Sequence, residues 1–232
     1  MPAPIAVIIP TLNAAHALPA TTEALLGGLT DGLVAELVLS DGGSKDGITD
    51  VARELGATLV TGPKGRGGQI SRGIAAAQAP WMLILHADTH LSDGWAQAVR
   101  SHMENHPDKA GWFRLRFRAN GFAPRLVAAG ANLRSFLLGL PYGDQGLLVA
   151  RATLEEVGGV PDIPLMEDLA LAHRLKGRLR PLDAIAFTSA ERYEAEGWLR
   201  RSTGNLGTLM RYLRGASPEE LVARYEGQDQ HR

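Results

Sequence analysis

Two aspartates of this 232-residue chain stand where a carboxylate can serve nucleotide chemistry. Asp41 follows an apolar run and precedes two glycines, so its carboxylate can accept hydrogen bonds from a nucleobase N–H or a ribose hydroxyl at close range. A turn-forming aspartate has the same neighbours. Asp88 follows another apolar run, and a carboxylate that faces bound phosphates suits Mg²⁺ or Mn²⁺. His86 and His90 flank Asp88 at strand spacing, where an imidazole can ligate Mn²⁺ or orient the carboxylate.

A third acidic position is the pair Glu167-Asp168, which begins a predicted helix. Carboxylates in the first turn of a helix offset the helix dipole, which is a structural role. A carboxylate at the same position can instead face a cleft and remove a proton from an attacking hydroxyl. The local sequence leaves both interpretations open.

Arginine and glycine residues supply a second kind of candidate. Arg66 lies in the glycine-rich stretch 62–68, and Arg192 follows Ser189 at a short distance. Either guanidinium can neutralise a diphosphate, although a plain flexible turn explains the glycines equally well. The usual motifs of a Rossmann dinucleotide site, a P-loop and a serine hydrolase are missing from the sequence.

Apolar runs that alternate with helical patterns are expected to position these residues. We predict strands over 5–9, 33–40, 58–61 and 81–85 and helices over 21–29 and 47–55, with a further helix after the glycine-rich stretch. Ser44 or Asp46 is expected to cap the helix over 47–55. Strands that alternate with helices predict a parallel sheet with helices on both faces, and ligands bind beyond the carboxyl ends of such strands.

The second half of the chain has a different pattern. Over 111–118, apolar side chains alternate with arginines, which predicts a one-sided strand at an edge of the sheet. We also predict a strand over 146–150 and helices over 122–138, 167–176 and 198–214, the last of them amphipathic and basic. Because we find no repeat and no linker, we expect a single domain over 1–232.

The composition excludes several classes of protein. A chain with 45% hydrophobic and 21% charged residues is not expected to be disordered. Lys and Arg number 24 against 25 Asp and Glu, so we expect no nucleic-acid partner. The sequence has no cysteine and hence no disulfide or thiolate chemistry. Neither a signal peptide nor a membrane span is recognisable, so we expect a cytoplasmic protein, with peripheral contact to the inner face of the membrane left open.

Taken in order, several stretches resemble the motifs of the family 2 glycosyltransferases, which have the GT-A fold. These stretches are Val7-Ile-Ile-Pro-Thr-Leu-Asn13, SDGGSKDG over 40–47, GRGGQISRG over 65–73, His86-Ala-Asp88, YGDQG over 142–146 and PLMED over 164–168. The first position of the family's D-x-D motif is His86, and its Q-x-x-R-W motif is reduced to SAERY over 189–193. The HADT and GDQG stretches and the short length resemble a small bacterial subgroup encoded near radical-SAM and selenium-domain proteins.

The resemblance implies an α/β fold of GT-A type, with a Rossmann-like, mostly parallel sheet covered by helices on both faces. Residues 1–91 would form the nucleotide-sugar half and 92–232 a small mixed acceptor half. The contacts to the nucleotide sugar implied by the resemblance are Pro10, Thr11, Asn13, Asp41, Gly65, Arg66, Gln69, Ala87, Asp88 and Arg192.

The resemblance also implies Mg²⁺ or Mn²⁺ as a cofactor, held by Asp88 with His86 at the neighbouring ligand position. The acceptor-side residues would be Tyr142, Gly143, Asp144 and Gln145. In that family the aspartate of the E-D pair is the usual base, so Asp168 ranks ahead of Glu167 for an inverting transfer from a UDP, GDP or dTDP sugar to an acceptor hydroxyl.

Two other functions fit a similar fold. A sugar-phosphate nucleotidyltransferase usually carries an N-terminal G-x-G-x-R loop, which residues 9–13 do not resemble. A non-catalytic nucleotide-sugar-binding module would not need Asp88 together with Glu167-Asp168. The donor sugar, the acceptor and the oligomeric state do not follow from the sequence.

Overall fold

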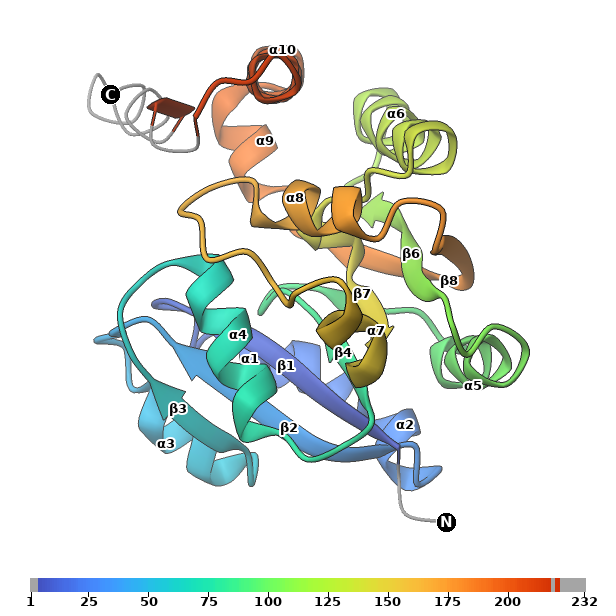
Figure 1. Cartoon of the computed structure of the whole chain (residues 1–232). Helices are drawn as coiled ribbons and strands as arrows, with labels where there is room; N and C mark the ends of the chain where they lie inside the picture. Colours follow the sequence, from blue (N-terminus) through green and yellow to red (C-terminus); the bar gives the residue numbers. More distant parts are fainter. Residues whose placement is uncertain (1–3, 218–219, 222–232) are drawn as a thin grey trace.

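An eight-stranded sheet runs through the molecule, with helices on both of its faces (Figure 1). The computed structural model describes residues 4–217 and 220–221. The strands are β1 (Ile5–Thr11), β2 (Val34–Asp41), β3 (Thr58–Thr61), β4 (Trp81–Ile84), β5 (His90–Leu91), β6 (Ala110–Phe117), β7 (Leu147–Ala150) and β8 (Leu179–Thr188). Their order across the sheet is β3-β2-β1-β4-β7-β6-β8-β5.

The direction of the strands changes in the middle of this sheet. The first four strands in the sheet order are mutually parallel, as are β6 and β8. The strand β7 runs antiparallel to both β4 and β6, and β5 runs antiparallel to β8. The prediction of a mostly parallel α/β sheet with a smaller mixed half is therefore confirmed.

The helices cover both faces of the sheet. They are α1 (Leu18–Glu23), α2 (Leu26–Thr30), α3 (Ile48–Glu54), α4 (Arg66–Ala76), α5 (Trp95–Asn105), α6 (Phe122–Leu138), the 3₁₀ helix η1 (Gly143–Gln145), α7 (Arg151–Glu156), α8 (Glu167–Arg174), α9 (Glu191–Glu196) and α10 (Trp198–Leu213). Among the described residues, no helix has both the length and the apolar character needed to cross a bilayer.

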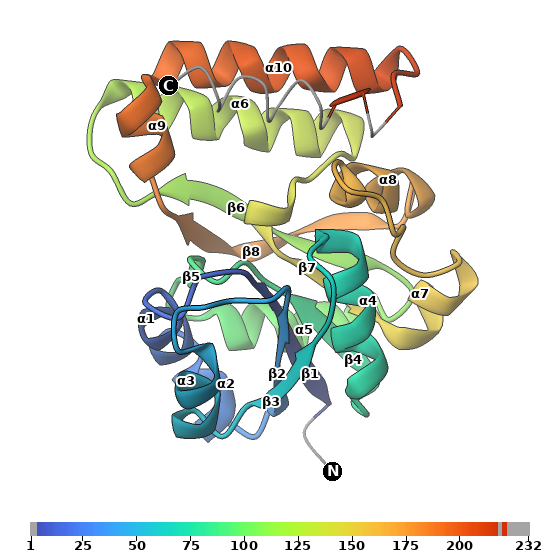
Figure 2. The same ribbon diagram turned by 90° about the vertical axis from the view of Figure 1, so that its left-hand side faces the viewer.

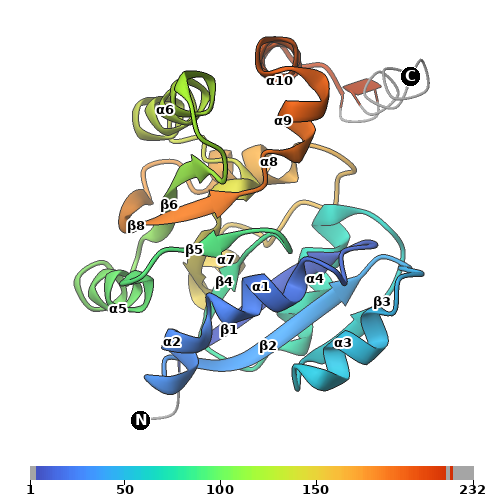
Figure 3. The same cartoon turned by 180° about the vertical axis from the view of Figure 1, so that it is seen from behind.

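Alternation along β1 shows how the two faces are built. Val7 and Ile9 pack into a buried cluster with side chains of α1, α3 and α5, whereas Ile8 packs with side chains of α4, α7 and α8. All three β1 residues are fully buried, because a strand covered on both faces has no polar side. Figure 1 shows α4 in front of β1 and β2, and Figure 3, seen from behind, shows α1 on the opposite face.

The first half of the chain follows the sequence-based expectations closely. The four predicted strands correspond to β1–β4, with ends that differ by one or two residues. The helix predicted over 21–29 is divided into α1 and α2. The prediction that Ser44 or Asp46 caps α3 is wrong, because α3 has no side-chain cap and begins after Gly47. Asp46 instead accepts a hydrogen bond of 2.7 Å from the backbone N–H of Ala15.

In the second half, one prediction has to be corrected. The strand predicted over 111–118 is β6, and its alternating burial is confirmed, but it lies between β7 and β8 rather than at an edge. Its arginine face is solvated although β8 pairs with it along its length and β7 pairs with it at Gly111. The sequence pattern predicts no strand over 179–188, where β8 forms. The helix predicted over 122–138 is confirmed as α6, and the two later helices are confirmed as α8 and α10.

Candidate active site

The carboxyl ends of β1, β2 and β4 lie at one rim of the sheet because these strands are parallel. Ile84, the last residue of β4, pairs with Leu147 at the start of the antiparallel β7. The 3₁₀ helix η1 comes directly before β7, so it also lies at this rim. The topology therefore brings the segments after residues 11, 41 and 84 close to the segment before residue 147.

Asp41 is buried at this rim and holds a turn. Its Oδ2 accepts hydrogen bonds of 2.8 Å from the backbone N–H groups of Gly43 and Ser44, and its Oδ1 accepts hydrogen bonds from the hydroxyls of Thr11 and Ser44. Burial alone would raise the pKa of Asp41, but these hydrogen bonds outweigh it and hold the pKa below its usual value. Asp41 is thus an anion whose four lone-pair positions are occupied by three donors of its own turn and by the hydroxyl of Thr11 in β1.

Asn13 and Gln69 connect this turn to its neighbours. Asn13 has a positive φ of 51°, and its Oδ1 accepts a hydrogen bond of 2.9 Å from the backbone of Lys45. Gln69 of α4 is buried and donates from Nε2 to the carbonyl oxygens of Thr11 (2.7 Å) and Ser40 (2.9 Å). The amide of Gln69 therefore fixes α4 against the ends of β1 and β2.

The glycine-rich stretch before α4 allows close packing. Gly65 has a φ of 142°, a conformation that favours glycine, and its N–H donates to Gln69 Oε1. A Cβ on Gly67 would lie 2.1 Å from the carbonyl oxygen of Pro161. The N-terminus of α4 thus packs directly on the segment that leads into α8, which places Arg66 beside Glu167 with Nε and Oε1 3.3 Å apart.

The two carboxylates at the start of α8 have different surroundings. Glu167 is 4% exposed, and its burial, reinforced by the charge of Asp168, raises its pKa to about 7 against the opposing effect of Arg66. Asp168 is half-buried, and its two oxygens accept hydrogen bonds of 2.7 Å from the backbone N–H groups of Gly143 and Leu169. Met166, directly before the pair, has a positive φ of 65°, a strained backbone of the kind that clusters at functional sites.

His86 lies on the other side of Gly143. A Cβ on Gly143 would lie 2.5 Å from His86 Nε2, so η1 passes between the imidazole and Asp168. Burial holds the pKa of His86 well below its ordinary value, and the positive charges of Arg66 and Arg192 lower it further. His86 is thus a neutral imidazole, and its Nε2 has no hydrogen-bond partner within the described part of the chain.

Asp144 of η1 is the third carboxylate of this region. Burial raises its pKa to about 6; Arg134 opposes the shift, and the charges of Asp168 and Asp88 add to it. Both Asp88 and Asp168 are thus within electrostatic reach of Asp144. Asp144 Oδ1 is buried and has no hydrogen-bond partner among the described residues.

The other residues of η1 hold the segment in place. Tyr142 stacks under the guanidinium of Arg134 at 3.5 Å from its ring centre, and its burial raises its pKa to about 12. Gln145 is fully buried, where its Oε1 accepts from the hydroxyl of Ser135 (2.6 Å) and its Nε2 donates to the side chain of Asn132 (3.3 Å). Gln145 therefore binds η1 to α6 rather than facing the cleft.

A cavity of about 40 Å³ lies between α4, β4, η1 and α8. Its polar lining consists of Arg66, His86, Tyr142, Glu167 and Asp168. This volume holds one or two water molecules, so a nucleotide sugar has to bind above it or open it. A more open hollow of about 510 Å³ is lined by Arg192 of α9 together with Glu191, Ala195, Glu196 and Arg200.

The structure divides the predicted residues into two groups. Around the cavity it brings together Pro10, Arg66, His86, Tyr142, Gly143, Glu167 and Asp168, with Asp88, Asp144 and Arg192 within electrostatic reach. The second group, at the ends of β1 and β2, consists of Thr11, Asn13, Asp41, Gly65 and Gln69. The helix α4 links the two groups, because Arg66 and Gln69 lie one turn apart on it.

Three further residues hold the site and were missed in the sequence. Arg118 donates from Nη1 to the carbonyl oxygen of Asp88 at 2.7 Å, and the hydroxyl of Thr21 donates to that of Ala87 at 2.6 Å. Arg134 stacks on Tyr142. The only signal for Arg118 was its place in the alternating arginine pattern, and neither Thr21 nor Arg134 stands out by residue type or spacing.

The residues at this rim fit a divalent cation only together with other ligands. Within residues 4–217 and 220–221, no three His, Asp or Glu side chains form a set that could hold a metal. Mg²⁺ and Mn²⁺ commonly take one or two carboxylates and complete their shell with phosphate oxygens and water. Asp88 and the neutral His86 with its unpaired Nε2 fit such an open site.

This arrangement of a parallel nucleotide-type half and carboxylates at one rim is that of a GT-A glycosyltransferase. Residues 6–143 match the family model described as Glycosyl transferase family 2, and this match covers more than half of the chain. The chain therefore belongs to glycosyl transferase family 2.

Curated relatives include the "PGL/p-HBAD biosynthesis glycosyltransferase" of Mycobacterium tuberculosis and that of Mycobacterium bovis. Each is 37% identical over 99 residues, which make up 39% of this chain and 38% of the relative. The match thus spans well under half the length of these relatives.

Solved structures share the fold at low sequence identity. Residues 1–349 of S. aureus TarS match with a TM-score of 0.61 and 14% identity, covering 84% of this chain and 63% of that one. Glucosyl-3-phosphoglycerate synthase from Mycobacterium tuberculosis, in complex with Mn²⁺, UDP and glucosyl-3-phosphoglycerate, matches with a TM-score of 0.55 and 20% identity over 80% of this chain and 70% of that one. These likenesses establish the GT-A fold.

Proposed function

We propose that this protein transfers a sugar, with inversion, from a nucleoside diphosphate sugar to an acceptor hydroxyl. Membership of glycosyl transferase family 2 supports glycosyl transfer. Structures of similar fold contain UDP or UDP-GlcNAc, which favours a UDP sugar over GDP and dTDP sugars. The observation that carries the proposal is the cavity that brings Arg66, His86 and the pair Glu167–Asp168 together, with Asp88 and Asp144 within electrostatic reach.

Asp168 is our candidate for the base. The N–H groups of Gly143 and Leu169 fix its carboxylate at the N-terminus of α8, and its partial exposure leaves it open to an acceptor. The acceptor hydroxyl would give its proton to Asp168 while its oxygen bonds to the anomeric carbon and the bond from that carbon to the diphosphate breaks. Glu167, buried and paired with Arg66, would position that arginine instead of taking the proton.

The diphosphate would lie between α4 and the segment after β4. Arg66 and Arg192 are the cationic candidates for it, and Asp88 with His86 would hold Mg²⁺ or Mn²⁺. When bound, such a cation neutralises the charge that develops on the leaving diphosphate.

The nucleoside would lie against Pro10, Thr11, Asn13 and Asp41, with Gly65, Gln69 and Ala87 shaping its surroundings. Because four donors already occupy Asp41, a contact from its carboxylate to a base N–H would require one of them to move. The acceptor would approach Tyr142, Gly143 and Asp144, while Gln145 supports them from the interior.

The division into a nucleotide half over 1–91 and an acceptor half over 92–232 is part of this proposal, and so is the bacterial subgroup that the HADT and GDQG stretches resemble. The change of strand direction between β4 and β7 supports such a division. A nucleotidyltransferase has no support from the family match.

Thermal unfolding with a panel of UDP, GDP and dTDP sugars, with and without Mn²⁺, tests the donor site. A donor at about 100 times its Kd stabilises the folded state by about 2.7 kcal/mol. For a chain of this size that stabilisation raises the Tm by roughly 5–10 °C. We expect this rise to depend on Mn²⁺, to disappear in Asp88→Ala and to persist in Asp93→Ala, which changes an exposed aspartate nearby.

If no sugar nucleotide raises the Tm, the donor site is refuted. If a donor binds but is neither transferred nor hydrolysed, the protein is a binding module. Equal stabilisation with and without Mn²⁺ would remove Asp88 as a metal ligand.

A further inference from the structure

The helix α6 is built with its large apolar side chains turned outward. Phe122 is 80% exposed and Phe136 is 69% exposed, and Leu126, Leu133 and Leu137 are exposed as well. The side that packs on β6 carries the smaller residues Pro124, Ala128 and Ser135. A surface helix of a protein in water normally buries its large apolar side chains and exposes its polar ones. The outward apolar side of α6 is therefore typical of a surface that binds another molecule or a membrane.

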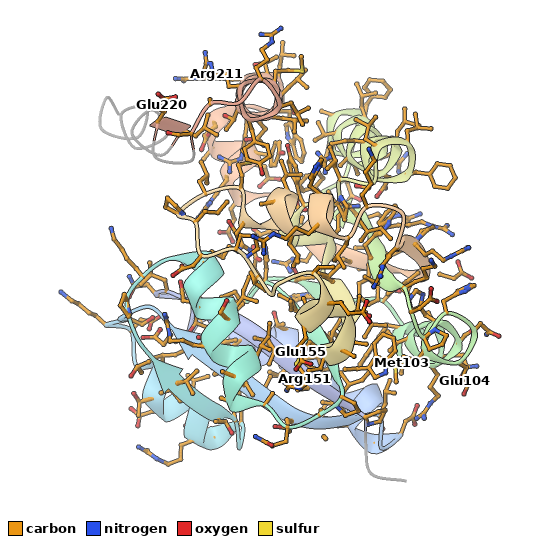
Figure 4. The ribbon with its side chains drawn as sticks, viewed as in Figure 1. Met103, Glu104, Arg151, Glu155, Arg211 and Glu220 are labelled. Atoms are coloured by element: carbon orange, nitrogen blue, oxygen red, sulfur yellow. The ribbon has the colours of Figure 1, made fainter. Side chains whose placement is uncertain are left out.

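The helix α10 shows the same feature with a basic border. Leu199, Leu206, Met210 and Leu213 are exposed and follow one another at spacings of seven, four and three residues, so they form one stripe along the helix. The next stripe around the helix contains Arg200 and Arg211, which are also exposed. Figure 4 shows Arg211 at the outer side of α10, pointing away from the sheet.

The two helices contact each other and lie side by side on the side of the molecule opposite α3 and the β1–β3 half (Figures 1 and 2). We refer to the exposed side chains of 122–138 and 198–213 as the α6–α10 face. Neither range contains an aspartate or a glutamate, and of their arginines Arg125, Arg200 and Arg211 are exposed, whereas Arg134 stacks on Tyr142 and Arg201 is largely buried and paired with Glu196. In a chain whose net charge is −1, this face is therefore a local excess of positive charge next to apolar side chains.

We propose that the α6–α10 face is a docking surface for a membrane of anionic phospholipid. Apolar side chains flanked by arginines are the composition of helices that lie in a bilayer interface, where the rings and leucines enter the acyl region and the guanidinium groups meet lipid phosphates. Long arginine side chains can reach the headgroups while their stems lie on apolar surface. Since none of the described helices can span a bilayer, the contact would be peripheral.

The charge of this face favours lipid over a second copy of the chain. Two copies packed through it would bring arginines against arginines with no carboxylate from either helix between them, which opposes association. An anionic bilayer supplies many negative charges over a broad area, which matches two adjacent helices of 17 and 16 residues. This inference does not depend on the proposed transferase activity.

Co-sedimentation of the full chain with vesicles tests the proposal. One set of vesicles contains phosphatidylcholine alone, and in the other a third of the lipid is phosphatidylglycerol. We expect binding to the anionic vesicles that weakens as salt is added, and little binding to the neutral ones. The double variants Phe122→Ser/Phe136→Ser and Arg200→Glu/Arg211→Glu should each weaken binding by at least about tenfold.

Matched controls change similar residues on the far side of the molecule. Leu26→Ser and Arg53→Glu alter an exposed leucine of α2 and an exposed arginine of α3, and both variants should bind as the unchanged protein does. Circular dichroism shows whether each variant is folded. The proposal is overturned by absence of binding, by equal binding to neutral vesicles, by folded double variants that bind normally, or by a concentration-dependent dimer that both double variants abolish.

Discussion

The adjacent carboxylates of Glu167 and Asp168 differ in what each can do. Glu167 is buried and has a guanidinium partner, whereas Asp168 is partly exposed and is held by two backbone N–H groups. When the surroundings of two neighbouring acidic groups differ in this way, their roles differ as well. This difference is the reason for our proposal that Asp168 is the base and Glu167 its support.

The variant Asp168→Asn should lower transfer by about 10²-fold or more, because the amide cannot take a proton from the acceptor. The amide oxygen can still accept from Gly143, so we expect the donor to bind with nearly unchanged affinity. Single-turnover rates and calorimetric titration of the donor measure these two quantities. Asp183→Asn, which changes a highly exposed aspartate of β8, should leave both unchanged. A full rate of transfer in Asp168→Asn would assign the base elsewhere.

At the level of elements, the packing of α4 on the segment before α8 decides whether Arg66 reaches Glu167. A Cβ at Gly67 would lie 2.1 Å from the carbonyl oxygen of Pro161, which is backbone and cannot rotate away. We expect Gly67→Ala to lower the free energy of unfolding by about 1–3 kcal/mol through overpacking. Donor affinity should fall as well, because α4 carries both Arg66 and Gln69.

Gly130→Ala is the matched control for this change. Gly130 lies in the interior of α6, where an added Cβ would meet no atom within 4 Å, so alanine there should raise the free energy of unfolding by about 0.5–1 kcal/mol. Urea unfolding measures both variants. If Gly67→Ala also raises stability, the close approach of α4 to Pro161 is not a constraint.

Some positions of the strands in the sheet follow from the sequence, and others do not. The carboxyl ends of β1, β2 and β4 lie at one rim, as the alternation of strands and helices predicts, because these strands are parallel. The strand β6 was misplaced because alternation reports which face is buried and says nothing about pairing along its edges. Its partner β8 contains Arg180, Pro181 and Asp183, which weaken the local strand pattern.

The contacts that hold the site were harder to predict for the same reason. Arg118, Arg134 and Thr21 act through carbonyl groups or an aromatic ring of distant segments, and their residue types carry no local signal of those partners. Asp46 was predicted to cap a helix because it comes shortly before one. In the structure its carboxylate instead accepts a hydrogen bond from the backbone N–H of Ala15, in the turn that follows β1.

At the scale of the whole molecule, the buried acidic groups make stability depend on pH in opposite directions. The pKa of Asp41 is lowered on folding, so it adds stability above its unfolded pKa, and this contribution is lost as the pH falls through its folded value. The pKa values of Glu167 and Asp144 are raised to about 7 and about 6. Their contribution is fully present below their unfolded values and is lost as the pH rises through the folded ones.

We therefore expect the free energy of unfolding to decline between about pH 4.5 and pH 7, with Glu167 responsible for on the order of 2–3 kcal/mol of the change. Glu167→Gln cannot ionise, so the same measurement on this variant should give a flatter profile, and its stability should gain on that of the unchanged protein as the pH rises. Glu191→Gln, an exposed position on α9, should keep the original slope. Urea unfolding at a series of pH values makes the comparison. A constant difference between Glu167→Gln and the unchanged protein across this range would show that Glu167 is ionised throughout, and Arg66 would then be neutralised by a full carboxylate before any diphosphate arrives.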